Sequence, residues 1–180
     1  HNEDPTNLAF SMIMANCHVG AGNIEAALSI YNKVLQQTPD NPNVLLMLAH
    51  ALKAVDKVDE AIAAYQKAYK SKPDFGDAFW SLANLKTYRF SDAEINMMQR
   101  RQTDEQTALV DRFHFCFALG KAFEDKKDYA VAMEYYQLGN SLKKQQSRYK
   151  SEHIDKEFQT QIDTCTPALF ALKEGCGNTT

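Results

Sequence analysis

Small and aromatic residues recur along the chain at the three- and four-residue spacing that places side chains on one face of an α-helix. Two stretches align without a gap: Ala27-x3-Tyr31-x2-Val34, followed by Pro39, and Ala61-x3-Tyr65-x2-Ala68, followed by Pro73. Upstream of them lie two further matched blocks, Met14-Ala15-x2-His18 and Leu48-Ala49-x2-Leu52. Matched positions stand 34 residues apart, as Pro39 and Pro73 do. Two blocks per unit predict a repeating pair of antiparallel helices.

This period and these residue types resemble the tetratricopeptide repeat, in which small residues allow close helix contacts and Pro opens the next pair. The register predicts an all-α, right-handed α-solenoid of about four helix pairs, at 8–37, 42–71, 76–101 and 104–146, with C-terminal capping helices. The repeats would span 8–41, 42–75, 76–112 and 113–146, between an N-terminal extension at 1–7 and C-terminal helices and a junction at 147–180.

The third repeat departs from the pattern. Its first helix is expected to begin near Gly76, but its second lacks the Ala, aromatic, Ala triplet. Ser91 and Glu94 have the spacing of a capping box and predict the start of that second helix. About three residues are inserted before the fourth repeat, whose first helix is predicted to begin early, with Thr103 and Gln106 as its cap.

Turn residues fit the same register. Gly22, Asp56 and Lys127 fall at the left-handed position between the two helices of their repeats, where Gly is the least strained choice. Asn41 precedes Pro42, a pair that predicts a capped helix beginning at the proline.

After the repeats, Ile154, Phe158, Ile162 and Cys165 fall on one face of a further predicted helix. Because the end of a solenoid exposes an apolar face that must be covered, we expect residues 151–172 to cap the fourth repeat. The alternative is that this stripe packs against a domain that is absent from the sequence.

Composition and charge argue against nucleic-acid binding and membrane insertion. A formal net charge of −3 provides no basic field for nucleic acid. No apolar run approaches the roughly 20 residues that span a bilayer, and no signal-like segment opens the sequence, so we expect a cytoplasmic protein without membrane insertion. The cysteines, at positions 17, 116, 165 and 176, form no C-x-x-C pair and fit the free thiols of a reducing compartment.

Four passages match a more specific pattern: residues 80–95 (WSLANLKTYRFSDAEI), 117–125 (FALGKAFED) with 128–129, 135–140, and 166–170. They resemble the repeat region of bacterial tetratricopeptide-repeat sulfotransferases. The resemblance implies a parent protein in which a catalytic domain follows directly and binds 3′-phosphoadenosine 5′-phosphosulfate on a Pro-x-Arg-Ser-Gly loop. Because no such loop occurs here, the resemblance implies the N-terminal repeat region, with the catalytic domain absent.

We expect no catalysis by this chain and no catalytic, cofactor-binding or metal-binding residue. Phosphate-loop, dinucleotide-binding and zinc-protease motifs do not occur. Cys17-His18 and His114-x-Cys116 bring possible metal ligands close in sequence, but residues one or two apart do not share a helix face. Core or solvated side chains are therefore the default interpretation.

The predicted binding surface is the concave face formed by the first helices of the repeats. Positions are counted from the first residue of each repeat. The candidate residues are the fifth (Met12, Leu46, Trp80 and Phe117), the ninth (Asn16, His50, Asn84 and Lys121) and, in the second and third repeats, the twelfth (Lys53 and Thr87). An Asn can pair its donor and acceptor with the backbone of an extended peptide, and Trp80 would be a large anchor. The alternative is that Met12, Leu46 and Trp80 simply pack against neighbouring helices.

One class of partner is disfavoured. Chaperone-binding repeats hold a terminal carboxylate with Lys and Arg side chains, but Met12, Asp77 and Ser81 stand at three of those positions. Asp77 would repel an acidic tail.

The leading hypothesis is a protein-binding module that recruits or orients a polypeptide partner or acceptor for the C-terminal sulfotransferase domain of the parent. The alternatives are self-association or structural support of that domain, and a free-standing adaptor.

Overall fold

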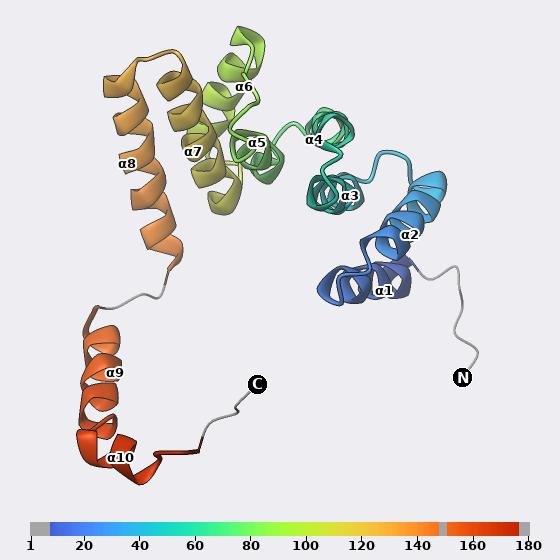
Figure 1. Cartoon of the computed structure of the whole chain (residues 1–180). Helices are drawn as coiled ribbons and strands as arrows, with labels where there is room; N and C mark the ends of the chain where they lie inside the picture. The colour runs from blue at the N-terminus through green and yellow to red at the C-terminus, as the bar shows by residue number, and fades with distance from the viewer. Residues whose placement is uncertain (1–7, 148–150, 177–180) are drawn as a thin grey trace. The chain divides into compact units, whose positions relative to one another are not determined.

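The computed structural model describes residues 8–147 and 151–176 (Figure 1). Its helices are α1 (Leu8–Gly20), α2 (Ile24–Gln37), α3 (Pro42–Ala54), α4 (Val58–Ser71), α5 (Gly76–Ala83), α6 (Asp92–Thr103), α7 (Leu109–Asp125), α8 (Tyr129–Gln146), α9 (Ser151–Thr164) and α10 (Pro167–Leu172). No strand occurs among these described residues, which agrees with the all-α prediction. The N-terminal extension at 1–7 lies outside them. The chain divides into two compact units at residue 144.

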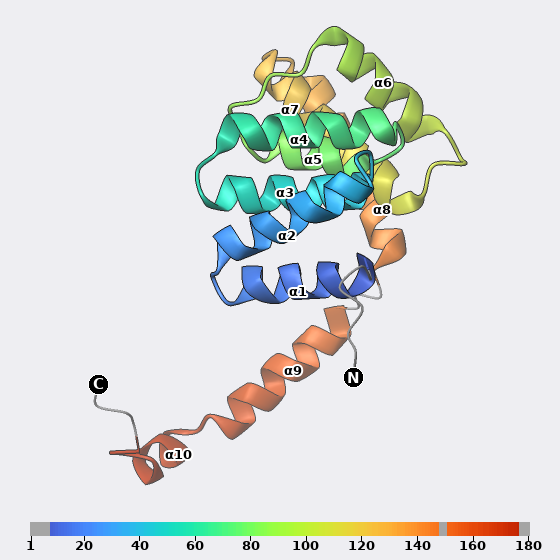
Figure 2. The same cartoon turned by 90° about the vertical axis from the view of Figure 1, so that its right-hand side faces the viewer.

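In the first unit, successive helices stack side by side (Figure 2). α1 packs on α2 and α3 on α4, while α2 contacts α3 and α4 contacts α5, so each pair continues into the next. Figure 1 shows α1, α3, α5 and α7 along the inner side of this stack and α2, α4 and α6 along its outer side. The first helices of the repeats therefore share one face.

Alanines in the second helices are buried. Ala27 and Ala61 have no exposed surface, and Ala132, the matching residue of the fourth repeat, is 3% exposed. One turn later, Tyr31 and Tyr65 are also buried. A small residue followed by a large ring lets neighbouring helices approach while the space between them stays filled.

The predicted turn chemistry is confirmed. Gly22, Asp56 and Lys127 have φ values of 77°, 60° and 64°, in the left-handed region. The Asn41 side chain accepts hydrogen bonds from the backbone N–H groups of residues 43 and 44 at 3.2 and 3.3 Å, and Pro42 is the first residue of α3. Local residue types therefore set where these helices begin and end.

The third repeat has a short first helix. α5 has 8 residues, whereas α1 and α3 have 13 each. A loop over 84–91 follows, in which Lys86 adopts a φ of 62°, and α6 then packs against α7. The loop displaces the second helix of this repeat from the usual pairing with the first.

A buried carboxylate fixes the start of α6. Oε1 of Glu94 accepts hydrogen bonds from the hydroxyls of Tyr69 and Tyr88 at 2.8 and 2.6 Å. Oε2 accepts from the backbone N–H and the hydroxyl of Ser91, both at 2.8 Å, and the predicted capping box is present. Burial alone would raise the pKa of Glu94, but the hydrogen bonds from Tyr88, Ser91 and Tyr69 outweigh it and lower that pKa. A charged hub thus joins α4, the loop and α6.

The first turn of α5 lies directly against α7. The N–H of Gly76 donates to Oδ1 of Asp111 at 2.9 Å, and Asp111 is buried. A Cβ atom at position 76 would lie 2.3 Å from the carbonyl oxygen of Asp111. The third and fourth repeats can therefore meet this closely because position 76 carries no side chain.

The predicted start of the first helix of the fourth repeat, near residue 104, was wrong. Thr103 is the last residue of α6, and α7 begins only at Leu109. The Thr103 hydroxyl donates to the carbonyls of Gln99 and Arg100, at 3.3 and 2.9 Å, so it closes the preceding helix instead of capping the next. Gln106 donates its backbone N–H to Oδ1 of Asp104 in the connecting turn. Hydroxyl residues can bond to either helix end, and the spacing alone did not distinguish the two.

In the second unit, α9 carries the predicted apolar stripe. Phe158 and Ile162 are exposed on it. The side chain of Thr166 caps α10 by accepting from the N–H of Leu169 at 3.2 Å, and Pro167 opens that helix. Capping of the fourth repeat by this unit remains a prediction.

Candidate binding face

The inner helices bring most of the predicted site residues to one face. Met12 and Asn16 come from α1, whereas Lys53 comes from α3. Trp80 comes from α5, and Lys121 comes from α7. Asn16 and Lys53 are exposed, and the other three are half-buried. Asn84 immediately follows α5 and is also exposed.

Two of the predicted residues are not on this face as expected. Leu46 is 3% exposed and belongs to the core, which agrees with the packing alternative. Thr87 lies in the loop after α5, where its hydroxyl donates to the carbonyl of Leu85 at 3.4 Å. The register assumed a first helix of full length, but α5 ends four residues earlier, at Ala83.

Asn16 and His50, the ninth residues of the first two repeats, each form a hydrogen bond with a tyrosine of the same repeat. The Tyr31 hydroxyl donates to Oδ1 of Asn16 at 2.8 Å, and the Tyr65 hydroxyl lies 2.8 Å from Nδ1 of His50. The two residues of each pair are 15 positions apart in the sequence. This recurring separation is a signal from which the two hydrogen bonds could have been predicted. Because the Asn16 oxygen is engaged, its amide N–H₂ is the group that remains for a partner.

Burial favours the neutral form of His50, because it lowers the pKa of this side chain. The negative charge of Asp77 raises this pKa, and the positive charge of Lys53 lowers it further. Neutral imidazole can accept the Tyr65 hydroxyl at Nδ1, which leaves Nε2 as the donor. Tyr65 is correspondingly hard to ionise, because burial followed by the charge of Asp77 raises its pKa to about 12.

An aromatic pair joins α5 to α7. The rings of Trp80 and Phe117 are 5.3 Å apart between centroids and tilted by 46°. Both residues are half-buried, so part of each side chain remains accessible. Asn84 makes no side-chain hydrogen bond within the described part of the chain. A ring platform beside an unpaired amide can hold an extended peptide by stacking and by backbone hydrogen bonds.

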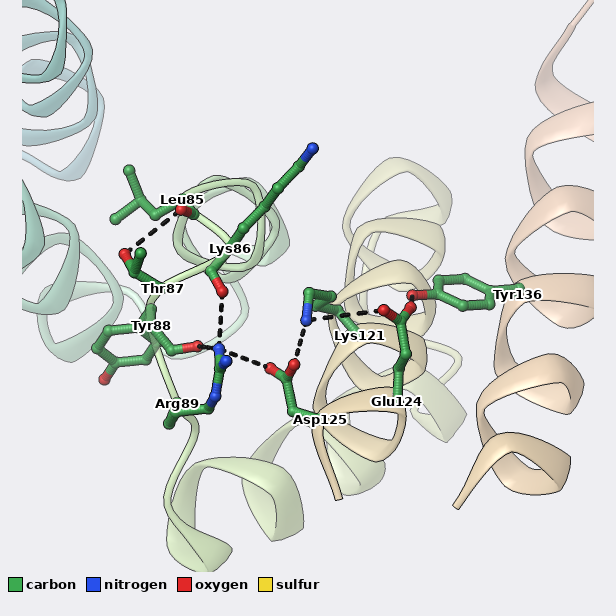
Figure 3. A network of polar contacts seen from close by, with 9 residues as sticks. All are labelled: Leu85, Lys86, Thr87, Tyr88, Arg89, Lys121, Glu124, Asp125 and Tyr136. Atoms are coloured by element: carbon green, nitrogen blue, oxygen red, sulfur yellow. Dashed lines mark hydrogen bonds and ion pairs between the residues drawn. The ribbon is translucent and has the colours of Figure 1, made fainter. Parts of the chain in front are cut away.

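Lys121 belongs to an ionic network that joins α7 to the loop after α5 (Figure 3). Its ammonium pairs with Asp125 and lies 3.9 Å from Oε1 of Glu124. Asp125 also lies 3.1 Å from Nη1 of Arg89, which donates to the carbonyls of residues 86 and 88 at 2.7 and 3.2 Å. The Tyr136 hydroxyl completes the network by donating to Glu124 at 2.9 Å.

This network gives Lys121 a role as a brace between the third and fourth repeats. Sequence reasoning missed Arg89 and Asp125 as its partners. The i,i+4 spacing of Lys121 and Asp125 was a signal for one pair, whereas the Arg89 contact depends on the loop conformation.

Asp77, the second residue of the third repeat, adds negative charge near His50 and His114. Asp77 is half-buried and accepts from the Ser81 hydroxyl at 3.4 Å. Burial lowers the pKa of His114, and the charges of Asp77 and then Asp111 oppose that effect. Burial likewise raises the pKa of the Cys116 thiol to about 11, so this residue is an unreactive core side chain.

Within 8–147 and 151–176, no group of three His, Cys, Asp or Glu side chains is arranged to hold a metal ion. Across the same residues, no helix is both long and apolar enough to cross a membrane.

Two family models match the chain, and both describe the tetratricopeptide repeat. One matches residues 18–85 and the other 113–146, and together they cover more than half of the 180 residues. The unmatched stretch between them contains α6 and most of the loop before it. No curated protein matches the sequence.

Solved structures share the fold at low sequence identity. A crystal structure of MamA has a TM-score of 0.57 at 17% identity, over 81% of this chain and 84% of that chain. The crystal structure of BtubC (BKLC) from P. vanneervenii has a TM-score of 0.59 at 16% identity, over 83% of this chain and 68% of that chain. These likenesses concern the fold alone. The two family matches show that the chain contains tetratricopeptide repeats over residues 18–85 and 113–146.

Proposed function

We propose that this chain is a protein-binding module that holds an extended polypeptide segment against its inner helices. Tetratricopeptide repeats imply an interaction scaffold. The observation that carries the proposal here is the half-buried Trp80–Phe117 pair, with the exposed amides of Asn16 and Asn84 on the same face. Rings supply contact area at low entropy cost, and the amides supply backbone pairing. Exposed free thiols at Cys17, Cys165 and Cys176 favour a cytoplasmic location.

The test begins with peptides selected from a random library on the wild-type chain. Their affinities are then measured by fluorescence anisotropy for Trp80→Ala, Asn84→Ala and, as a matched control, Asn32→Ala, whose side chain is exposed on the outer helix α2. We expect a loss of about tenfold or more for the first two variants, and no change for the control. Equal binding by all four proteins would refute the proposal.

The finer proposal is that the module is the N-terminal region of a sulfotransferase and orients its polypeptide acceptor. It rests on the sequence resemblance over residues 80–95 and 117–125. Reading about forty codons downstream of Thr180 tests the domain order. If the isolated catalytic domain kept the full kcat/KM on its natural acceptor, recruitment by the repeats would be refuted.

Self-association is the second candidate. The observation that favours it is the exposure of large apolar side chains at both ends of the repeat stack, Ile13 (61%) in α1 and Met133 (57%) in α8. A solenoid end of this kind can be covered by a second copy. Light scattering tests self-association separately from peptide binding. A strictly monomeric protein would exclude self-association and leave the peptide-binding proposal unaffected.

A further inference from the structure

A second surface lies on the outer side of the stack, between α4 and α6. Two adjoining hollows meet there, because both are lined by Ala93 and Met97. Tyr69 and Lys70 of α4 line one hollow, and Pro73 and Arg100 line the other. We call this surface the α4–α6 groove.

The groove results from the departure of the third repeat from the regular pattern. In a regular repeat, the second helix packs against the first helix of its own pair, as α4 does on α3. Here α6 packs on α7 instead. Its first turn is joined to α4 by the Tyr69 hydroxyl, which donates to the Glu94 carboxylate at 2.8 Å. The side chains of Ala93 and Met97 are therefore left to line an open channel.

The lining of the groove is basic although the chain as a whole is acidic. Four Lys or Arg residues contribute to the two hollows, against two carboxylates. One carboxylate, Glu94, is buried and accepts hydrogen bonds from neighbouring hydroxyls. The other, Asp104, lies 3.5 Å from Arg101. Lys70 and Arg100 make no ion pair within the described part of the chain. Two unpaired cations therefore flank an apolar floor.

We propose that the α4–α6 groove docks a short acidic segment of a partner protein. An apolar side chain of that segment packs on Met97 and Ala93, and its carboxylates pair with Lys70 and Arg100. Charge complementarity selects this occupant, since a basic segment would be repelled by the same two side chains. None of the residues that line the groove belongs to α1, α3, α5 or α7, so the array can hold two partners at once.

The probe is a fluorescein-labelled peptide in which glutamates flank two leucines. We compare the wild type with Lys70→Glu and Arg100→Glu, and with Lys33→Glu as the matched control, because Lys33 is exposed on α2 outside the groove. Anisotropy titrations are run at low and high salt, and far-UV circular dichroism checks that each variant folds. We expect saturable binding that falls about tenfold or more in the two groove variants, falls with salt, and is unchanged in the control.

Other outcomes would also decide the question. Absence of saturable wild-type binding up to about millimolar peptide, or an equal loss in Lys33→Glu, would overturn the proposal. So would tighter binding of a single-stranded oligonucleotide of equal charge, which would assign the groove to nucleic acid. Unchanged binding of the acidic peptide by Trp80→Ala would support a site separate from the inner face, and a loss there would overturn it.

Discussion

The Glu94 carboxylate joins α4, the loop after α5 and the start of α6. Replacing Glu94 with Gln keeps the size of the side chain but removes its charge and turns one acceptor oxygen into a donor. The hydrogen bonds from Tyr69 and Tyr88 then reach a neutral acceptor, and the donors of Ser91 face an amide N–H₂. Hydrogen bonds to a charged group contribute about 1.5–3 kcal/mol each and neutral ones about 1 kcal/mol, so we expect Glu94→Gln to cost roughly 2–4 kcal/mol.

The measurement is urea unfolding followed by the fluorescence of Trp80, the single tryptophan, which lies in α5 of the same repeat. Glu134→Gln is the matched control, because Glu134 is exposed on α8 and should change stability by less than about 0.5 kcal/mol. In a double-mutant cycle with Tyr69→Phe, we expect a coupling energy of about 1 kcal/mol or more. Independent, additive losses would refute the role of Glu94 as a hub.

The pH dependence provides a second check on Glu94. Its folded pKa lies below the value in the unfolded chain, so its stabilisation is complete above the unfolded pKa of about 4.3 and is lost as pH falls through the folded value. The difference between the wild type and Glu94→Gln should therefore shrink as the pH is lowered past about 4. A constant or widening difference would contradict the assigned ionisation state.

Four other predictions follow from single sites. Ala61→Leu should cost about 1–3 kcal/mol, because Ala61 has no exposed surface, and an unchanged denaturant midpoint would contradict the repeat register. Gly76→Ala should lower the midpoint by the equivalent of about 2 kcal/mol or more, since its Cβ would lie 2.3 Å from a backbone oxygen of α7, whereas Gly20→Ala, with nothing within 4 Å, should not. Burial lowers the pKa of His50, so stability should fall as pH drops below the unfolded value of about 6.5; His50→Gln should flatten this slope in urea titrations, and an identical slope would contradict it. If the second unit caps the fourth repeat, chymotrypsin should cut slowly at Phe158, and early cleavage there with the repeats intact would contradict docking.

The sequence by itself determined the repeat architecture. The 34-residue spacing of Ala61 and its counterpart Ala27 located the second helices, and Gly22, Asp56 and Asn41 located their boundaries. These features are readable because helix periodicity, capping and left-handed turns depend on residues close together in the chain. The capping box that opens α6 was predictable for the same reason.

Only the tertiary structure decided which side chains are available for binding. Leu46 is buried and Thr87 lies in a loop, although both occupy positions that the repeat pattern assigns to the binding face. The Glu94 carboxylate joins residues from α4 and α6, and the packing of α6 on α7 opens the α4–α6 groove. Such contacts depend on how helices far apart in sequence pack, and a local spacing carries no information about them.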